Sequence, residues 1–266
     1  MSTGRRFGGA GLRRGIRTPP PSAGGDGLPS LAYDWQAGAG VADDGAGPPP
    51  GVDTWTDQVA SLALADVSGK PNLITSDSDF GGEASIDFGV GTAILRDSAA
   101  SASFTFLHSG AGMTALFDLF VETTESGGGI IMETNNTSAT ALGVMIRYES
   151  GGGIRLLVGN GSANVVDITT GAVSKGARHR VMVRFASTVF DSDGDSRIAD
   201  IWVDGTRGAS QAAVSNAAAG GTPADKLAIG NRSTSTNIQL DGKFRRVSLA
   251  SSIITADEWD AWRAVS

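Results

Sequence analysis

Short runs of alternating apolar and polar residues dominate the chain from about residue 84 onward. In the run 179–185, Val181, Val183 and Phe185 would face a core, and the residues between them would face outward. A side-chain period of two is the pattern of a β-strand with one buried face. Comparable runs cover residues 84–88, 103–107, 115–122, 129–134, 142–148, 153–159, 164–169, 198–205, 226–230 and 243–250.

Clusters of Gly, Asn, Asp and Ser separate these runs and indicate tight turns. The 266 residues include 38 glycines, about twice the usual share of roughly 7%. Helical patterns do not alternate with the strands, so parallel βαβ units are not expected. The pattern therefore predicts an all-β domain, either a sandwich or a barrel. Cysteine is absent, so disulfides and a Cys-ligated metal are not expected.

A short helix is predicted at the C-terminal end. Thr255 is followed three residues later by Glu258, the spacing of a capping box at a helix start. Trp259 and Trp262 are three positions apart and would share one face of this helix. We expect the two indoles to pack in the core and seal one end of the sandwich. Stacking on a ligand is the alternative.

The first 53 residues have a different composition. Residues 1–30 show no hydrophobic period and contain a triple proline among glycines, which favours an extended segment without a core. Residues 31–53 contain a second triple proline, with residues 31–35 as a candidate first strand. We divide the chain into a basic Gly/Pro-rich arm (1–30), a loop-rich linker (31–53) and a β-sandwich (54–266).

Charge is distributed unevenly between the arm and the body. The chain carries a net charge of −7, but its first 25 residues hold five arginines and no acid, so the remainder has 16 basic and 28 acidic residues. Such an acidic body is a poor nucleic-acid surface. A Gly/Arg segment is seldom ordered unless something holds it, so we expect it to anchor the chain to other subunits, with an unattached tail as the alternative. The expected anchoring residues are Arg5, Arg6, Phe7, Arg13, Arg14 and Arg17.

Targeting signals also bear on where the protein acts. The sequence has no run of about 18 apolar residues, so membrane insertion is not expected. The N-terminal arginines are not followed by an apolar segment, so the start does not have the pattern of a secretory signal peptide. We expect synthesis in the cytoplasm and, if the protein acts outside the cell, release by another route such as lysis.

Several motifs occur in a recognisable order along the chain. They are Trp55-x-Asp57-Gln58, Lys-Pro-Asn-Leu at 70–73, Gly-Gly-x-Ala-Ser-Ile-Asp-Phe at 81–88, Ile-Trp-Val-Asp-Gly at 201–205, Leu-Ala-Ile-Gly-Asn at 227–231, the strand at 242–249 and the capped helix. Taken in this order, they resemble the concanavalin A-like jelly roll in its laminin-G-like form. The resemblance covers roughly residues 52–264.

The resemblance implies an antiparallel jelly-roll β-sandwich with two curved sheets. Members of this family include glycan-binding lectins, glycoside hydrolases and modules of bacteriophage tail and capsid proteins. The basic arm and the absent signal peptide are closer to the phage proteins. We therefore expect a structural or accessory virion protein, anchored by its arm, forming a homo-oligomer and attaching to a host-surface glycan. A soluble carbohydrate-binding module or lectin is the alternative.

Catalytic motifs are missing from the sequence. The Glu-x-Asp-x-x-Glu strand that carries the two carboxylates in glycosidases of this fold is absent, as are a Gly-x-Ser-x-Gly elbow and a phosphate-binding glycine loop. Asp200 and Asp204 would share a face with Trp202, but Asp204 directly precedes Gly205, as a hairpin-turn residue does. The sequence therefore predicts that the chain is not an enzyme, with a divergent glycoside hydrolase as the alternative.

Three tryptophans are the candidate sugar-binding residues, because an aromatic ring can pack against the C–H face of a sugar. They are Trp35, Trp55 and Trp202. Only 6% of the residues are aromatic, so the core competes for the same side chains. Both roles remain open for each of the three.

No cofactor is predicted, with one candidate metal site. Asp191, Asp193 and Asp195 present oxygens at alternate positions, as Ca²⁺-binding loops do. A solvated Asp/Gly turn is the alternative, because the bidentate Glu and the flanking helices of an EF-hand are missing. His108 and His179 have no partner at metal-ligand spacing, and we expect His179 to pack or to meet solvent.

Overall fold

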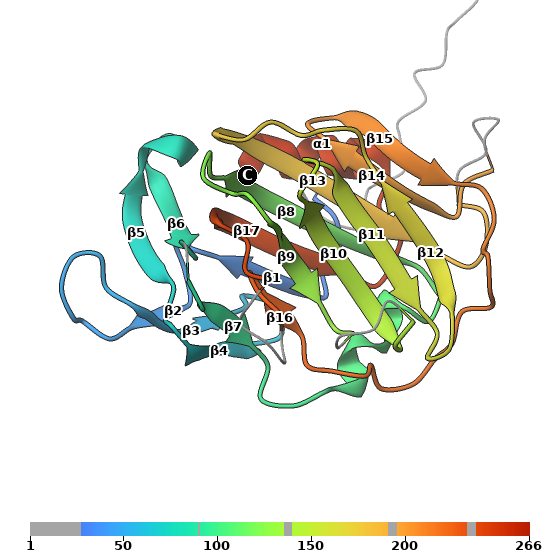
Figure 1. The fold of residues 1–266 in the computed structure, drawn as a ribbon, viewed down its shortest axis with the longest axis horizontal. Coiled ribbons are helices and arrows are strands. Elements are labelled where there is room, and N and C mark those ends of the chain that lie inside the picture. The colour runs from blue at the N-terminus through green and yellow to red at the C-terminus, as the bar shows by residue number, and fades with distance from the viewer. Residues whose placement is uncertain (1–27, 90, 136–139, 191–195, 233–237) are drawn as a thin grey trace, which may run out of the picture.

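The computed structural model describes residues 28–89, 91–135, 140–190, 196–232 and 238–266, which form two antiparallel β-sheets packed face to face (Figure 1). The predicted antiparallel β-sandwich is confirmed, and so is the short C-terminal helix α1 (Ala256–Val265). All six expected anchoring residues of the arm lie outside the described residues. In the described part of the chain, no helix is long and apolar enough to cross a membrane.

Sheet 1 contains eight strands in the order β15-β14-β13-β8-β17-β6-β5, with β1 also paired to β17. At the centre of this sheet, Val181 of β13 lies opposite Phe117 of β8, and Phe117 lies opposite Val247 of β17. The strands are β1 (Tyr33–Gln36), β5 (Asn72–Asp77), β6 (Glu83–Asp87), β8 (Met113–Val121), β13 (Ala177–Phe185), β14 (Ala199–Val203), β15 (Thr206–Gln211) and β17 (Gly242–Ala250).

Sheet 2 contains nine strands in the order β12-β11-β10-β9-β16-β7-β4-β3-β2. They are β2 (Val41–Asp43), β3 (Val52–Thr56), β4 (Ala63–Ser68), β7 (Ile94–Arg96), β9 (Gly128–Glu133), β10 (Gly143–Glu149), β11 (Ile154–Gly159), β12 (Asn164–Thr169) and β16 (Ala228–Ile229). Two 3₁₀ helices, η1 (Ser78–Phe80) and η2 (Ala102–Leu107), interrupt the strands.

One predicted strand is wrong. The run 103–107 forms η2 rather than a β-strand, and the side chain of Ser101 caps it by accepting a hydrogen bond from the N–H of Ser103 at 3.2 Å. Phe104 and Leu107 are buried because they are three residues apart, the period of a 3₁₀ helix. The run also places Phe104 and Phe106 two residues apart, so its five residues fit the period of a strand as well as that of a 3₁₀ helix.

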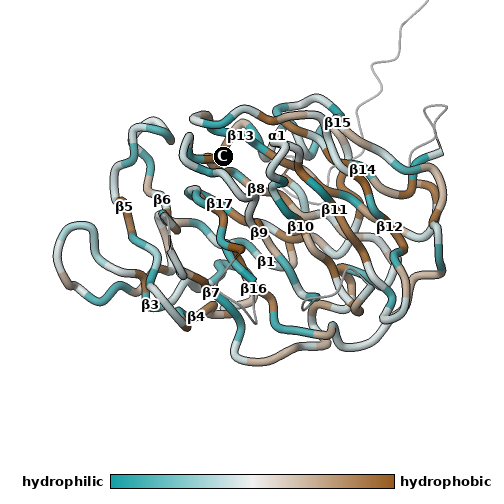
Figure 2. The backbone as a smooth tube through the Cα atoms, viewed as in Figure 1, coloured by the Kyte–Doolittle hydropathy of each residue, from teal (hydrophilic) through white to brown (hydrophobic). Residues whose placement is uncertain are grey.

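The main core lies between the two sheets and follows the predicted alternation. On β13 the side chains of Val181, Val183 and Phe185 join this core. On β8, Phe117 and Leu119 do the same. Figure 2 shows hydrophobic and hydrophilic positions alternating along the strands. Because successive side chains of a strand point to opposite faces, this alternation fixes which face of each sheet is buried.

Helix α1 covers the outer face of sheet 1. The capping box is confirmed, since the N–H of Glu258 donates to Thr255 Oγ1 at 3.2 Å and the N–H of Thr255 donates to Glu258 Oε2 at 2.7 Å. Trp259 and Trp262 stack at 5.5 Å and pack against Leu116 of β8 and neighbouring outer-face residues. The expectation that the pair seals one end of the sandwich is wrong. The indoles form a second core on the outer side of the sheet.

The first strand lies where the sequence suggested, at Tyr33–Gln36, and pairs with β17. Asp34 accepts hydrogen bonds from Arg246 Nε at 2.8 Å and Nη2 at 2.9 Å, and from Ser248 Oγ at 2.6 Å. Ser248 Oγ in turn accepts from Trp262 Nε1 at 3.1 Å. This buried polar network joins β1, β17 and α1. The segment 31–53 therefore contributes strands to both sheets, and the division into arm, linker and sandwich stays a prediction.

Candidate functional site

Two of the three predicted sugar-binding tryptophans lie in the main core. Trp35 and Trp55 are 0% exposed, and the ring of Trp35 stacks on Tyr33 at 5.5 Å. Both rings are packed inside the main core, so neither has a face exposed to a ligand. This outcome corresponds to the competing role that the low aromatic content suggested.

Trp202 lies half-buried on the outer face of sheet 1. Its Nε1 donates to Asp200 Oδ2 at 2.8 Å. The guanidinium groups of Arg184 and Arg207 lie 5.8 Å and 5.9 Å from the centre of its ring, which is within the range of cation–π contacts. The indole is therefore already held by one carboxylate and two cations of its own chain.

The predicted Ca²⁺ ligands Asp191, Asp193 and Asp195 lie outside the described residues. Among the residues that the structure does describe, no group of three or more His, Cys, Asp or Glu side chains is placed to hold a metal ion. Calcium binding by the 191–195 turn therefore stays a prediction.

A hollow of about 410 Å³ opens between the β12–β13 connection and the β14–β15 hairpin. Hydroxyl side chains, one imidazole and one carboxylate surround a small apolar floor. The lining residues are Thr170, Gly171, Ala172, Val173, Ser174, His179, Val203, Asp204, Thr206 and Gly208. We call this space the hairpin hollow.

The β14–β15 turn places Asp204 at the rim of the hairpin hollow. Asp204 and Gly205 have φ values of 51° and 87°, and two consecutive left-handed residues are typical of a tight hairpin turn. The predicted turn role of Asp204 is confirmed. The N–H of Arg180 donates to Asp204 Oδ1 at 2.8 Å, and the N–H of Asp204 donates to the Arg180 carbonyl at 2.8 Å. The carboxylate is thus fixed against β13.

His179 connects Asp204 to Ser174 across the floor of the hollow. Its Nδ1 lies 2.7 Å from Asp204 Oδ2, and its Nε2 lies 3.1 Å from Ser174 Oγ. Nε2 also lies 3.0 Å from the carbonyl oxygen of Ser174. The imidazole is 6% exposed, whereas Ser174 is exposed. The three side chains form one hydrogen-bonded unit that includes an exposed serine.

The surroundings of His179 favour its charged form. Burial lowers the pKa of His179, but the hydrogen bonds to Asp204 and to the Ser174 carbonyl outweigh burial, and the pKa rises above its ordinary value of 6.5. The same pairing acts on Asp204. Burial raises the pKa of this carboxyl, but the bonds from His179 and the Arg180 N–H lower it below 3.8. His179 and Asp204 therefore form a pair in which each side chain favours the charged form of the other.

Sequence reasoning missed this unit. It interpreted Asp204 as a turn residue and His179 as a packed or solvated side chain, and it did not single out Ser174. The signal lay in strand pairing, since Val181 lies opposite Val203 and this register brings the 204–205 turn beside His179. A predicted pairing of β13 with β14 would have placed the carboxylate next to the imidazole.

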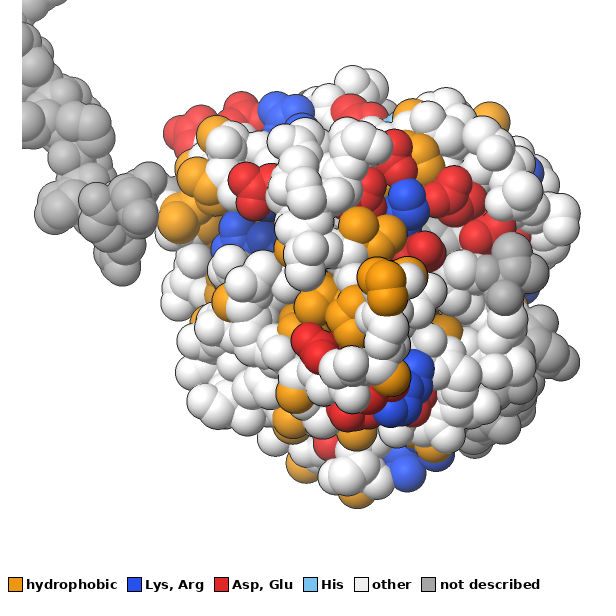
Figure 3. All heavy atoms as spheres, turned by 90° about the vertical axis from the view of Figure 1, so that its left-hand side faces the viewer, with side chains coloured by type: hydrophobic (Ala, Val, Ile, Leu, Met, Phe, Trp, Pro, Cys, Tyr) orange, Lys and Arg blue, Asp and Glu red, His pale blue; other side chains and the backbone are white. Residues whose placement is uncertain are grey.

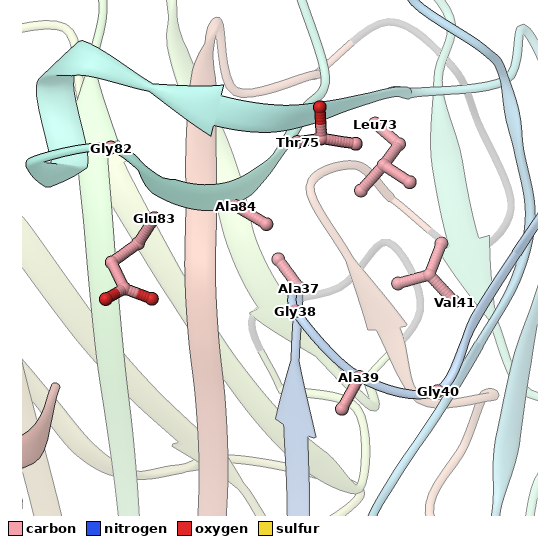
Figure 4. Close-up of a pocket in the computed structure, with 10 residues that line it drawn as sticks. All are labelled: Ala37, Gly38, Ala39, Gly40, Val41, Leu73, Thr75, Gly82, Glu83 and Ala84. Atoms are coloured by element: carbon pink, nitrogen blue, oxygen red, sulfur yellow. The ribbon is translucent and has the colours of Figure 1, made fainter.

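A second hollow of about 490 Å³ lies between the β1–β2 turn and strands β5 and β6 (Figure 4). Its lining consists mainly of glycine and small apolar residues, with Leu73 and Val41 facing the space and Glu83 extending away from them. Figure 3 shows hydrophobic side chains gathered on this side of the molecule, with acidic side chains around them. This hollow has few hydrogen-bonding side chains, so the hairpin hollow is the better candidate for chemistry.

Comparisons with known proteins identify the fold. No family model matches the chain, and no curated protein matches it. Trypanosoma rangeli sialidase in complex with sialic acid is similar over 88% of this chain, with a TM-score of 0.58 and 12% identity, but only 33% of the sialidase is covered. The receptor-binding domain of botulinum neurotoxin type G is similar over 89% of this chain and 51% of its own length, with a TM-score of 0.56 and 7% identity.

These similarities show the fold alone, because the identities are low. This chain spans about a third of the length of the sialidases it resembles. The prediction from the sequence that the chain is not an enzyme is contradicted, because most of the similar structures are enzymes, the sialidases. The absence of the three catalytic motifs argued only against the mechanisms that depend on those motifs. The concanavalin A-like family itself stays a prediction.

Proposed function

We propose that this chain is a glycan-binding β-sandwich protein whose sugar site is the hairpin hollow. The single observation that carries the proposal is the position of Asp204. Its carboxylate is held by His179 and by the Arg180 N–H at the rim of the hollow, yet half of its side chain (50%) remains exposed. A fixed and accessible carboxylate is a strong acceptor for the hydroxyl groups of a sugar.

The hydrogen-bonding capacity of the hollow suits a sugar. An ionised carboxylate offers about four acceptor positions, and two positions on Asp204 are used by His179 and Arg180. The exposed hydroxyls of Ser174 and Thr206 both donate and accept, as sugar hydroxyls do. Val173 forms an apolar part of the lining, which can contact the C–H groups of the ring.

Small residues keep this space open. A Cβ atom added at Gly208 would lie 2.9 Å from Thr170 Cγ2, so the absence of a side chain there leaves room within the lining. The fold supports the same proposal, since it is shared with a sialidase bound to sialic acid and with a receptor-binding domain.

A glycan array followed by calorimetry on the selected sugar tests the proposal. We expect Asp204→Asn to weaken binding by roughly 10- to 150-fold, since a hydrogen bond to a charged group contributes about 1.5–3 kcal/mol. Thr75→Ala, in the second hollow, is the matched control and should bind normally. Equal affinity of the Asp204→Asn variant and the wild type, with both folded, would place the sugar elsewhere. Specific loss in Trp202→Phe would move the site to the outer face of sheet 1.

The proposal extends to the setting in which the sandwich works. We propose that it belongs to a bacteriophage particle, in which the arginine-rich arm binds other virion proteins and the sandwich meets a host-surface glycan. The support is the charge contrast between arm and body together with the resemblance described above. The alternative is a soluble carbohydrate-binding protein.

Deletion of the arm separates these two settings. We expect a chain without residues 1–30 to keep its β-sheet circular dichroism and its sugar affinity but to be absent from purified particles. Normal incorporation of the truncated chain would show that the arm is not the anchor. Absence of the full-length chain from the particles would favour the soluble protein.

A further inference from the structure

We propose that Ser174 and His179 are the nucleophile and general base of an ester-cleaving site, with Asp204 as the residue that positions the imidazole. The natural substrate would be an acyl ester of a sugar hydroxyl. Only this choice of substrate rests on the proposed glycan binding. The hydrolytic unit itself stands on the geometry of the three side chains.

The geometry has the required order of contacts. A nucleophilic serine needs a base within hydrogen-bond reach, and the base needs a third group that fixes its orientation. The distances of 3.1 Å from Ser174 Oγ to His179 Nε2 and 2.7 Å from His179 Nδ1 to Asp204 Oδ2 meet both needs. Such units recur on unrelated folds and are recognised by geometry rather than by sequence position, so a missing Gly-x-Ser-x-Gly motif does not exclude one.

The two protonation states of His179 use different contacts between Nε2 and Ser174. When the imidazole is charged, Nε2–H donates to the carbonyl oxygen of Ser174, 3.0 Å away. When it is neutral, Asp204 keeps the proton on Nδ1, and the lone pair of Nε2 accepts the hydroxyl hydrogen of Ser174. The neutral state is the reactive one, because only an unprotonated Nε2 can take a proton from the serine.

The reaction balances with water as the second substrate. Ser174 Oγ bonds to the acyl carbon while its proton moves to His179 Nε2 and the carbonyl π electrons move to the carbonyl oxygen. Collapse of this intermediate breaks the bond to the sugar oxygen, which leaves with the proton from Nε2. Water then attacks the acyl-serine through the same base, so that a carboxylic acid leaves and the hydroxyl of Ser174 is restored.

The surroundings indicate a small acyl group. Ser174 is exposed at the mouth of the hairpin hollow, and Val173 and Val203 supply its apolar lining. A volume of about 410 Å³ is near the lower end of the range for ligand pockets. An acetyl group on one sugar residue fits these dimensions better than a long acyl chain.

The unit is tested first without any sugar. The full chain is incubated with p-nitrophenyl acetate, and separately with a fluorophosphonate that forms a stable bond to activated serines. We expect wild-type hydrolysis to exceed that of Ser174→Ala at least tenfold, and mass spectrometry to find the fluorophosphonate on Ser174. Ser210→Ala changes an exposed serine of β15 and is the matched control, with wild-type hydrolysis. Equal rates for wild type and Ser174→Ala, with no label on Ser174, would overturn the proposal.

The pH profile tests the positioning role of Asp204. The charged group that faces His179 from the β14–β15 turn is Asp204. Lys175, on the β12–β13 connection, donates instead to the carbonyl of Glu125. Hydrolysis should rise with pH around a midpoint above 6.5 as His179 loses its proton. In Asp204→Asn the midpoint should fall, because the carboxylate that raises the pKa of His179 is gone. An unchanged midpoint would contradict the role of Asp204.

Failure of this proposal is distinguishable from failure of sugar binding. Ser174→Ala loses one neutral hydroxyl of the hollow, so its binding of the sugar selected on the array should be less impaired than that of Asp204→Asn. At a concentration of the O-acetylated sugar that saturates the hollow, it should release no acetate. Cleavage of the aryl ester without any sugar binding would sustain the hydrolytic unit and refute the glycan site. Sugar binding by a wild type that neither cleaves p-nitrophenyl acetate nor reacts with the fluorophosphonate at Ser174 would do the reverse.

Discussion

The buried pair of Asp34 and Arg246 offers a direct test of how the first strand is held. Asp34 is 4% exposed and Arg246 is 8% exposed. Their two hydrogen bonds, at 2.8 Å and 2.9 Å, connect β1 to β17 over more than 200 residues of sequence. Asp34→Asn keeps the shape of the side chain but leaves the guanidinium without its counter-charge.

The expected cost is large because the remaining charge is buried. Removing one partner of a buried ion pair typically costs about 3–5 kcal/mol. The matched control is Asp167→Asn. This residue pairs with Arg155 through two bonds of 2.7 Å but is 38% exposed, and exposed pairs contribute about 0–1 kcal/mol. The two variants therefore compare one contact geometry at two levels of burial.

Urea unfolding followed by tryptophan fluorescence and circular dichroism gives both values. Coincident transitions by the two probes would justify a two-state analysis. We expect Asp34→Asn to lower the free energy of unfolding by about 3–5 kcal/mol, with an unchanged m-value. Adding Arg246→Gln should cost less than the sum of the two single changes. A loss below that of Asp167→Asn would refute the reasoning that β1 is held by this buried pair.

Three further predictions follow from single contacts. Gly129→Ala should cost at least about 1–3 kcal/mol, because its Cβ would lie 2.2 Å from Leu240 Cα, whereas Gly127→Ala meets nothing within 4 Å and should be near neutral; urea unfolding of both variants compares them. Burial lowers the pKa of His108 below 6.5, so its contribution to stability is lost as the pH falls below that value; the wild type should lose more stability than His108→Gln between pH 7 and pH 5. The pKa of His179 is raised, so its contribution is present below pH 6.5 and is lost as the pH rises through the folded pKa; His179→Gln should be destabilised at pH 6 and less so at pH 9. A wild type that loses no more stability than His108→Gln would contradict the first assignment, and a His179→Gln variant destabilised equally at pH 6 and pH 9 would contradict the second.

The sequence predicted the strands in which apolar residues all lie on one face. The alternation in 179–185 and 115–122 matches β13 and β8 because one face of each strand forms the main core. Strands β4 and β5 carry polar residues on partly exposed faces, so they show no such period. On the outer face of β8, Leu116 is buried because α1 returns to pack against it. That tertiary contact is not visible in a local pattern.

Site residues were harder to predict because the same side chains serve packing and binding. Trp35 and Trp55 were candidates by residue type, but a sandwich with few aromatics buries them. The hydrogen-bonded unit instead depends on a loop residue, Ser174, and a turn residue, Asp204, that both contact His179. Each has an ordinary local role, and only the pairing of β13 with β14 brings the three together. Residue type alone could not show this.

The central claim is that Ser174, His179 and Asp204 form one hydrogen-bonded unit, and imidazole NMR tests it most directly. The chain has only two histidines, so both can be titrated separately in one sample. We predict that His179 titrates above pH 6.5 and His108 below it, and that Asp204→Asn lowers the pKa of His179 while leaving His108 unchanged. If His179 titrates at or below its ordinary value and does not respond to Asp204→Asn, the unit does not exist in solution.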